Sequence, residues 1–173
     1  KENTGHGDTI RNAYMDTAQK YTWIFQIDSD DEISPDGFKK LWQQKYNFDF
    51  LIGIRERTGQ PLIRQLISFI SRITVKIFYG FAGPVDVNCP YRLMKSERFL
   101  KLFYAIPEKT FAPNVLISGY IAKEKIKFYQ TEIKYKQRQT GTVSIRKFKL
   151  LKVSVVSFLQ TIKFRFKEIN NVK

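Results

Sequence analysis

The chain alternates between short apolar runs of strand length and longer stretches with helical spacing of apolar residues. Residues 23–27 and 48–54 are the clearest apolar runs, and their length and their aromatic and branched side chains predict buried β-strands. Between them, Ser34 and Pro35 predict a helix over residues 35–44, with Ser34 as N-cap and Pro35 in the first helical position. A helix between buried strands indicates a βαβ unit and a sheet that is at least partly parallel.

The remaining elements follow from the same rules. Apolar spacing predicts helices over residues 8–15, 61–78, 96–104, 114–122 and 148–166, and a strand over residues 126–135. Asp8 would lie in the first turn of its helix or at its cap. Residues 80–90 are rich in Gly and Pro and predict a loop, and residues 86–94 continue it with polar groups among apolar ones. The predicted fold class is therefore α/β, with a mixed sheet flanked by helices and an amphipathic helix at the C-terminal end.

Composition bounds the chemistry. The length of 173 residues fits one domain, and a hydrophobic content of 43% is enough for a core. Cys89 is the one cysteine, so no intrachain disulfide forms, which fits a reducing compartment. His6 is the one histidine. One histidine and one cysteine are too few for a zinc site built from such ligands within the chain, and His6 is the one histidine that could act as the base of a Ser-His type triad.

No signal peptide is visible, and no apolar stretch reaches the roughly 18 uncharged residues of a transmembrane helix. The chain begins without Met, inside what reads as a structural unit, so we expect that an N-terminal portion is absent. Thirty Lys and Arg against 16 Asp and Glu give a formal net charge of +14. This excess predicts an anionic partner, such as nucleic acid, a phosphorylated substrate or an acidic membrane surface.

An acidic cluster, Asp28-Ser-Asp-Asp-Glu32, stands out against this basic background. It follows the first apolar run directly, at the end of a predicted strand, where open α/β sheets bind ligands. Asp28 and Asp30 point to the same side of an extended segment, and a shared Mg²⁺ or Mn²⁺ would relieve their repulsion. The alternative is a solvated acidic turn in which Glu32 and Asp36 serve the dipole of the next helix.

Basic and polar motifs follow the acidic cluster along the chain. Arg55 follows the second predicted strand, and Arg64 and Ser68 lie one helical turn apart. Arginine suits phosphate because its planar fork donates paired hydrogen bonds, although each arginine can equally be ordinary surface charge. Two polar loops, residues 86–94 and 138–144, have simpler interpretations as a turn with an Asp86–Arg92 salt bridge and as a β-turn, respectively.

The helices predicted over residues 61–78 and 148–166 are amphipathic and cationic. A wide apolar face beside a stripe of Arg64, Arg72 and Lys76 fits a helix that lies on an anionic membrane surface. The alternatives are packing on the sheet for the first helix and a core or oligomer contact for the second.

Taken in order, the motifs resemble those of the family 2 glycosyltransferases with a GT-A fold, and among them the polyprenyl-phosphate sugar synthases. The resemblance covers residues up to about 149 and rests on these segments: Gly5-His6-Gly7, Asp28-x-Asp30, Gly53-Ile54-Arg55, Arg64-x-x-x-Ser68, Asp86 through Met94, and Arg138-x-x-Gly141-x-x-Ser144. It implies that residues 1–149 form the C-terminal portion of a Rossmann-like GT-A domain and that residues 150–173 form a basic amphipathic helical tail. The family's nucleotide-binding first half and its frequent C-terminal membrane helices are not found in this sequence.

The resemblance implies roles for individual residues. Asp28 and Asp30 would hold Mg²⁺ or Mn²⁺ and the sugar-nucleotide diphosphate, and Glu32, at a position where glutamine is common, would complete the metal shell. The implied acceptor-phosphate ligands are Arg55, Arg64, Ser68 and Arg92, and Arg138 would contact the donor phosphate. The implied catalytic set is Asp28, Asp30, Arg55 and Asp86.

The expected function is metal-dependent, inverting transfer of a sugar from a nucleotide-sugar donor to an acceptor, favouring polyprenyl phosphate, at the cytoplasmic face of the membrane. A glycan hydroxyl is the alternative acceptor and would need a carboxylate base, for which Asp86 is the strongest candidate and Glu108 a weaker one. A basic, non-catalytic module that binds nucleic acid or membrane is the other alternative. No nucleic-acid recognition motif is present, so nucleic acid is not the expected partner.

Overall fold

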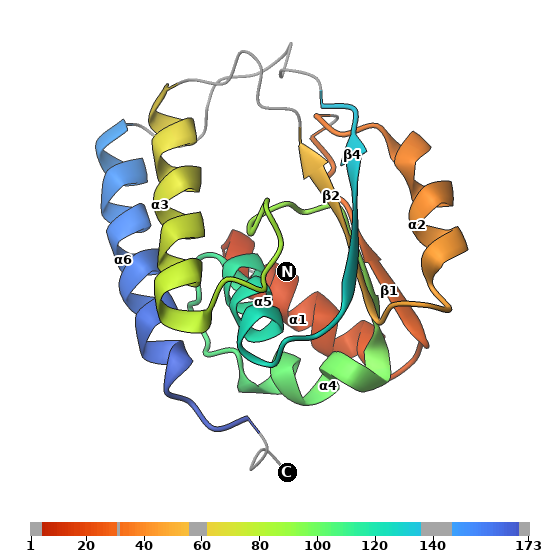
Figure 1. Cartoon of the computed structure of the whole chain (residues 1–173). Helices are drawn as coiled ribbons and strands as arrows, with labels where there is room; N and C mark the ends of the chain where they lie inside the picture. The colour runs from red at the N-terminus through yellow and green to blue at the C-terminus, as the bar shows by residue number, and fades with distance from the viewer. Residues whose placement is uncertain (1–4, 31, 56–61, 136–146, 170–173) are drawn as a thin grey trace.

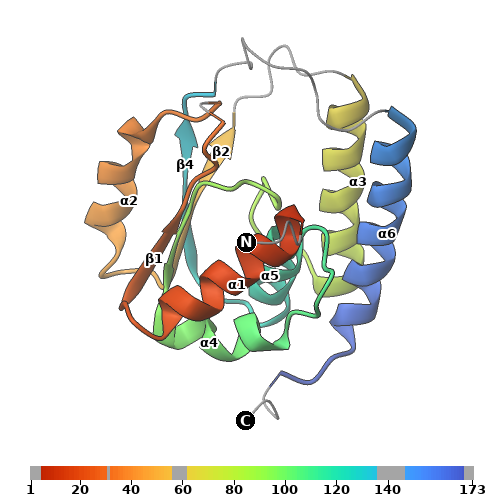
Figure 2. The ribbon, with the colours of Figure 1, turned by 180° about the vertical axis from the view of Figure 1, so that it is seen from behind.

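The computed structural model describes residues 5–30, 32–55, 62–135 and 147–169, with the side chains of residues 64 and 147–151 excepted. A four-stranded mixed sheet lies at the centre (Figure 1). Helix α2 covers one face, and α1, α4 and α5 cover the other (Figures 1 and 2). Helices α3 and α6 lie side by side outside α5 and form a further layer.

The sheet runs in the order β1-β3-β2-β4. Strand β3 pairs antiparallel with both β1 and β2, and β2 pairs parallel with β4. Strands β1, β2 and β4 therefore share one direction, and their carboxyl ends reach the same edge of the sheet. The strands are β1 (Trp23–Gln26), β2 (Phe50–Arg55), β3 (Arg92–Lys95) and β4 (Phe128–Ile133).

The helices match the sequence predictions to within a few residues at each end. Ser34 caps a 3₁₀ turn, Pro35–Gly37, and its Oγ accepts a hydrogen bond from the Asp36 backbone N–H at 3.4 Å, as predicted. That turn leads into α2. The α-helices are α1 (His6–Ala18), α2 (Phe38–Gln44), α3 (Leu62–Tyr79), α4 (Ser96–Ala105), α5 (Pro113–Lys123) and α6 (Lys147–Arg165).

The predicted α/β class with a mixed sheet is confirmed, and two local predictions are wrong. Residues 92–94 were expected in a loop, but they begin β3, which enters the sheet between β1 and β2. The strands flanking α2 are therefore not neighbours in a simple βαβ unit, and the parallel pair is β2 with β4. A buried arginine at the start of β3 hid this strand from the hydrophobic pattern.

The middle of the sheet is buried on both faces. In β2, the four residues Phe50 to Gly53 are all buried, which is the continuous apolar pattern of a strand covered on both sides. Gly53 has no side chain because an added Cβ would lie 2.6 Å from Ile133 Cδ1 on the neighbouring strand. The ring of Tyr14 in α1 stacks on Phe103 in α4, with centroids 4.8 Å apart, and closes one side of the core.

The end of α6 is fastened to the rest of the molecule. Arg165 Nε donates to the Phe78 carbonyl at 2.7 Å, and Lys167 Nζ donates to the Ala105 carbonyl at 2.6 Å. Phe164 and Ile169 are buried in the main core cluster. Among the helices in the described ranges, none is both long and apolar enough to cross a bilayer.

The first turn of α1 docks closely on the loop before α5. An added Cβ on Gly7 would lie 1.8 Å from the Thr110 carbonyl oxygen, and Asp8 Oδ1 accepts from the Lys109 backbone N–H at 2.7 Å. We expect Gly7→Ala to lower the free energy of unfolding by about 1–3 kcal/mol, because the backbone must move to admit the methyl group. Urea unfolding followed by circular dichroism measures this.

The matched control is Asn12→Ala, at an exposed position of the same helix. It should change the stability by about 0.5 kcal/mol or less. Equal effects of the two substitutions would contradict the close approach at Gly7.

Candidate functional site

The candidate site lies where the carboxyl ends of β1, β2 and β4 meet. The acidic loop that holds Asp28 follows β1, and Arg55 is the last residue of β2. The loop that holds Asp86 precedes β3 at the same edge, since β3 runs in the opposite direction. This edge is where open α/β sheets place their ligands. The topology thus brings together segments that are far apart in the sequence.

The acidic loop is held by specific hydrogen bonds. Asp28 is half-buried and Asp30 is exposed. Asp30 Oδ1 accepts from the Glu32 backbone N–H at 3.3 Å, and Glu32 Oε2 accepts from the Tyr135 hydroxyl at 2.8 Å. A β-bridge between Ile33 and Tyr135 adds a second link to the chain after β4. Glu32 is thus positioned from across the sheet edge, by Tyr135.

The pKa of Asp28 is shifted by burial and by the other charged groups at this edge. Burial raises the pKa of Asp28, and the carboxylates of Asp30 and Glu32 raise it further, while His6 and Arg55 lower it. The net result is a carboxylate that is harder to ionise than a free aspartate. A cation bound beside it would offset this cost.

Arg55 and Asp86 form a paired ionic contact at the end of β2. Arg55 Nε donates to Asp86 Oδ2 at 2.8 Å, and Nη2 donates to Oδ1 at 2.9 Å. The side chain of Asp86 is 2% exposed and that of Arg55 is 19% exposed. Burial lowers the pKa of Arg55, but its hydrogen bonds to Asp86 and the charge of Asp86 outweigh this and leave the pKa raised. The Asp86–Arg92 salt bridge considered from the sequence is therefore wrong.

Arg92 does not line the site edge as an accessible phosphate ligand. Its side chain is fully buried, and burial lowers its pKa. Its guanidinium donates to the carbonyls of Cys89 at 2.7 and 2.9 Å, Asn114 at 3.2 Å and Val87 at 3.4 Å. These carbonyls replace water around the cation. Arg92 therefore fastens the loop that positions Asp86 rather than facing solvent, which corrects the acceptor-phosphate role implied for it.

Buried hydrogen bonds tie the end of β1, just before the acidic loop, to α1 and α5. The Tyr14 hydroxyl contacts the side-chain amide of Gln26, the last residue of β1, and donates to Asn114 Oδ1 at 2.9 Å. Burial raises the pKa of Tyr14, so its hydroxyl stays protonated at neutral pH. The buried Cys89 has its pKa raised to about 12 by burial, which makes it an inert thiol.

The structure gives fewer contacts for the other predicted site residues. Ser68 is half-buried on α3, one turn after the backbone position of Arg64, so both belong to one face of that helix. The side chain of Arg64 lies outside the described part of the structure, as does all of Arg138. Asp31, in the middle of the acidic cluster, also lies outside it.

A polar cavity of 380 Å³ adjoins Arg55 on the α2 side of the sheet edge. Lys40 from α2 and Lys134, the residue after β4, line it, together with Glu132. Three cationic side chains against one carboxylate make this cavity suitable for an anion such as phosphate. The lysines gave no sequence signal because lysine is common on exposed helix faces and strand ends.

His6 and Tyr135 also belong to the site edge and were not predicted. His6 is exposed in the first turn of α1 and acts electrostatically on Asp28. Its position in a Gly-His-Gly segment before a helix was a usable signal. Tyr135 had none, since it lies 103 residues from its partner Glu32.

The donor set partly fits a divalent metal. Within the described ranges, no three His, Cys, Asp or Glu side chains gather closely enough to hold an ion by themselves. Magnesium in phosphate-transfer sites, however, needs only one or two carboxylates, with water and substrate phosphates as the other ligands. Asp28 and Asp30 satisfy this smaller requirement, and the raised pKa of Asp28 is the kind of strain that a cation relieves.

No protein-family model and no curated protein matches the sequence.

The charge of Asp28 should destabilise the apo protein at neutral pH. Because its folded pKa is raised, the unfavourable interaction is present above that pKa and disappears as the pH falls through it. We expect Asp28→Asn, measured with EDTA, to raise Tm at pH 7 by up to about 2–4 °C. The difference from the wild type should shrink in acid.

Thermal unfolding followed by circular dichroism between pH 4 and 7 measures this, with the exposed Asp16→Asn as a control that leaves Tm unchanged. A lower Tm for Asp28→Asn at pH 7 would show that Asp28 makes favourable contacts instead.

The Arg55–Asp86 pair should be costly to break from one side. We expect Asp86→Ala to lower the free energy of unfolding by about 3–5 kcal/mol, because it leaves a largely buried guanidinium unpaired. The double variant Arg55→Met/Asp86→Leu should lose less than the single variant, since no unpaired charge remains. Urea unfolding of the wild type, the single variant and the double variant measures both losses.

The control is Asp49→Ala, which removes a partly exposed pair with Lys95 at 3.9 Å. That change should cost about 1 kcal/mol at most. A similar small loss for Asp86→Ala would rule out a buried, paired role for Asp86.

Proposed function

We propose that this chain is part of a metal-dependent, inverting glycosyltransferase that moves a sugar from a nucleotide-sugar donor to a phosphate acceptor. The observation that supports this most is the meeting of Asp28, Asp30 and Glu32 with Arg55 at one edge of a mixed sheet. Such a reaction needs anionic groups to hold a cation and cationic groups to hold phosphate, and this edge supplies both. The mixed sheet also supports the finer proposal of a partial GT-A fold.

The donor half of the proposal assigns the acidic loop. Asp28 and Asp30 would hold Mg²⁺ or Mn²⁺, which when bound would neutralise the negative charge that develops on the departing diphosphate. The Tyr135–Glu32 bond and the Tyr14 link beneath β1 keep the loop in place, so that little reorganisation accompanies the reaction. Arg138 remains a proposed donor-phosphate contact.

The acceptor half assigns Arg55 and its neighbours. Asp86 binds Nε and Nη2 of Arg55, which fixes the plane of the guanidinium. Lys40 and Lys134 line the cavity beside it and would add positive charge for an acceptor phosphate. Arg64 and Ser68 remain proposed ligands from α3.

The state of Asp86 favours a phosphate acceptor over a hydroxyl. A hydroxyl acceptor needs a general base that can reach it. Asp86 is buried and both of its oxygens accept hydrogen bonds from Arg55, so it is poorly placed for that role. A phosphate oxygen is already ionised at neutral pH. It would attack the anomeric carbon as the bond to the diphosphate oxygen breaks, and the configuration would invert.

The outer helices favour action at a membrane surface. Of the 18 large hydrophobic side chains exposed in the described ranges, six lie on α3 and four on α6. Exposed apolar groups beside Arg72, Lys76 and Lys163 suit the boundary of an anionic bilayer, whereas nucleic acid would use the cations alone. We therefore place the protein at the cytoplasmic face of the membrane, bound peripherally, with a polyprenyl phosphate as the favoured acceptor.

The decisive experiment is sugar transfer by the protein as it is encoded in full, with Mn²⁺, a labelled nucleotide sugar and polyprenyl phosphate. We expect Asp28→Asn and Asp30→Asn each to reduce turnover by roughly 10²-fold or more, by analogy with the loss of one transition-state contact. Asp16→Asn should retain full activity, because that carboxylate is exposed on α1.

A second readout separates metal loss from misfolding. Mn²⁺ binding followed by electron paramagnetic resonance should weaken in both site variants while their circular dichroism spectra stay unchanged. Full turnover in either variant would refute the proposed role of the acidic loop.

A further inference from the structure

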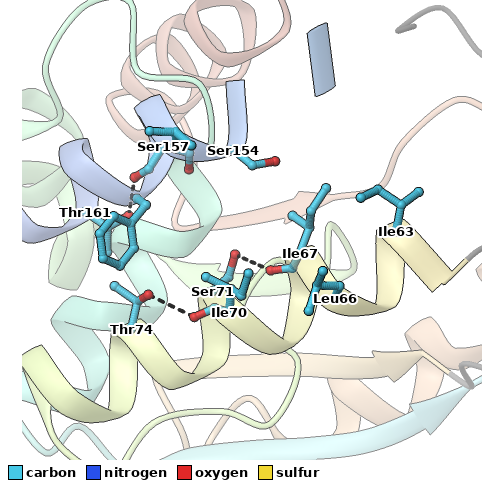
Figure 3. A pocket seen from close by; sticks show the side chains of 11 residues that line it. Ile63, Leu66, Ile67, Ile70, Ser71, Thr74, Ser154, Ser157 and Thr161 are labelled. Atoms are coloured by element: carbon cyan, nitrogen blue, oxygen red, sulfur yellow. Dashed lines mark hydrogen bonds between the residues drawn. The ribbon is translucent and has the colours of Figure 1, made fainter. Parts of the chain in front are cut away.

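A groove of 230 Å³ runs between α3 and α6, away from the sheet edge that holds the charged groups. Figure 3 shows its lining, which comes from the facing sides of the two helices. Its apolar walls are formed by Ile63, Leu66, Ile67, Ile70, Val155 and Phe158. The groove is thus a separate feature from the cavity beside Arg55.

Small hydroxyl residues explain why the helices leave a groove here. Ser71, Thr74 and Thr161 lie between α3 and α6, where larger side chains would interlock. Each hydroxyl donates back to a carbonyl of its own helix, at 2.9 Å for Ser71 to Ile67, 2.8 Å for Thr74 to Ile70 and 2.7 Å for Thr161 to Ser157 (Figure 3). With their donors used, these residues present mainly carbon to the groove. Its surface is therefore apolar in effect as well as in outline.

The outward faces of α3 and α6, on either side of the groove, carry exposed apolar side chains. Leu62 is 83% exposed and Ile77 is 68% exposed on α3, and Leu159 is 59% exposed on α6. The sequence has no Asp or Glu in residues 62–85 or 147–167, while both segments contain several Lys and Arg. A surface that combines exposed apolar groups with a single sign of charge is complementary to an anionic lipid layer.

The groove also begins at the same end of the molecule as the candidate site. Helices α3 and α6 run side by side in the same direction, and their N-terminal ends lie at the end of the molecule towards which β2 and β4 point (Figure 1). Ile63 and Ser154 line this part of the groove. A bound chain would thus extend from the level of the sheet edge along the two helices.

We propose that this groove binds one hydrocarbon chain of an anionic phospholipid from the membrane surface, to which the cations of α3 and α6 attract the protein. Its volume of 230 Å³ is below the ~300–1,000 Å³ of typical drug-sized sites and suits a single slender chain. A second copy of the protein is disfavoured as the occupant, because two surfaces of the same positive sign repel. The inference deepens the membrane part of the proposed function and needs no catalytic activity.

The test places a fluorescent reporter in the groove. Phe158, which is 36% exposed and lines the groove, is replaced in Phe158→Trp. The native Trp23 and Trp42 lie on β1 and α2, away from α3 and α6, and act as an internal reference. The protein is mixed with phosphatidylglycerol vesicles that carry bromine on their acyl chains and contain no polyprenyl phosphate or nucleotide sugar.

We expect the added emission of Phe158→Trp to be largely quenched and the native emission to be retained. Ser157→Leu in the same background should abolish most of this quenching, because the larger side chain fills the groove. The control Tyr46→Ser removes an exposed aromatic residue next to α2 and should leave the quenching unchanged. Circular dichroism checks that each variant is folded, and the reporter alone keeps the test informative if Ser157→Leu does not fold.

Charge provides an independent arm. Arg72→Gln and Lys76→Gln should each weaken vesicle binding by about fivefold, the loss of one near-surface cation, whereas Lys39→Gln on α2 should not. Equal binding to neutral phosphatidylcholine vesicles would overturn the proposal. So would quenching that appears only after polyprenyl phosphate is added, or a concentration-dependent dimer that protects the reporter from brominated lipid. If the protein shows the expected quenching but transfers no sugar, the proposed function is refuted and the lipid-binding proposal stands.

Discussion

The paired contact between Arg55 and Asp86 is the constraint on which the site depends. It ties the end of β2 to the loop that must turn back before β3, with bonds of 2.8 and 2.9 Å. Arg92 completes the same loop from inside, by donating to the carbonyls of Cys89 and Val87. Together these guanidinium groups hold an antiparallel strand between two strands of the opposite direction. Buried ion pairs seldom add stability over apolar packing, so such an arrangement is better explained by the geometry it imposes.

That geometry has an electrostatic consequence at the neighbouring strand end. Asp28 is partly removed from water and lies in the field of two further carboxylates, so its pKa is raised. Among the described residues, His6 and Arg55 offset this only in part, and the guanidinium of Arg55 is already bonded to Asp86. A site that keeps one carboxylate strained and one arginine rigidly oriented would be stabilised by ligands that bring the opposite charges. A metal ion and a phosphate are the pair that would do so.

The sequence predicted local elements well and long-range contacts poorly, for physical reasons. The run at residues 23–27 and the Ser34–Pro35 helix start are local signals, and both appear in the structure. Strand β3 was missed because Arg92 looks like a surface residue until the carbonyls that surround it are brought together by the fold. Asp86 was paired with Arg92, six positions away, whereas its partner Arg55 lies 31 positions away. The Tyr135–Glu32 bond spans 103 positions and follows only from the parallel pairing of β2 with β4.

The charged sheet edge and the apolar outer layer are close to each other along the chain. Arg55 ends β2 at the sheet edge, and α3, which belongs to the apolar outer layer, begins at Leu62, so the two surfaces lie close together along the chain. Helix α6 pairs with α3 and is anchored at its far end by Arg165 and Lys167. Because that end is fixed in the core, the exposed faces of both helices are held in a set orientation to the sheet. A membrane bound to these helices would therefore be presented to the site at a defined angle, which is what a reaction between a water-soluble donor and a lipid-borne phosphate requires.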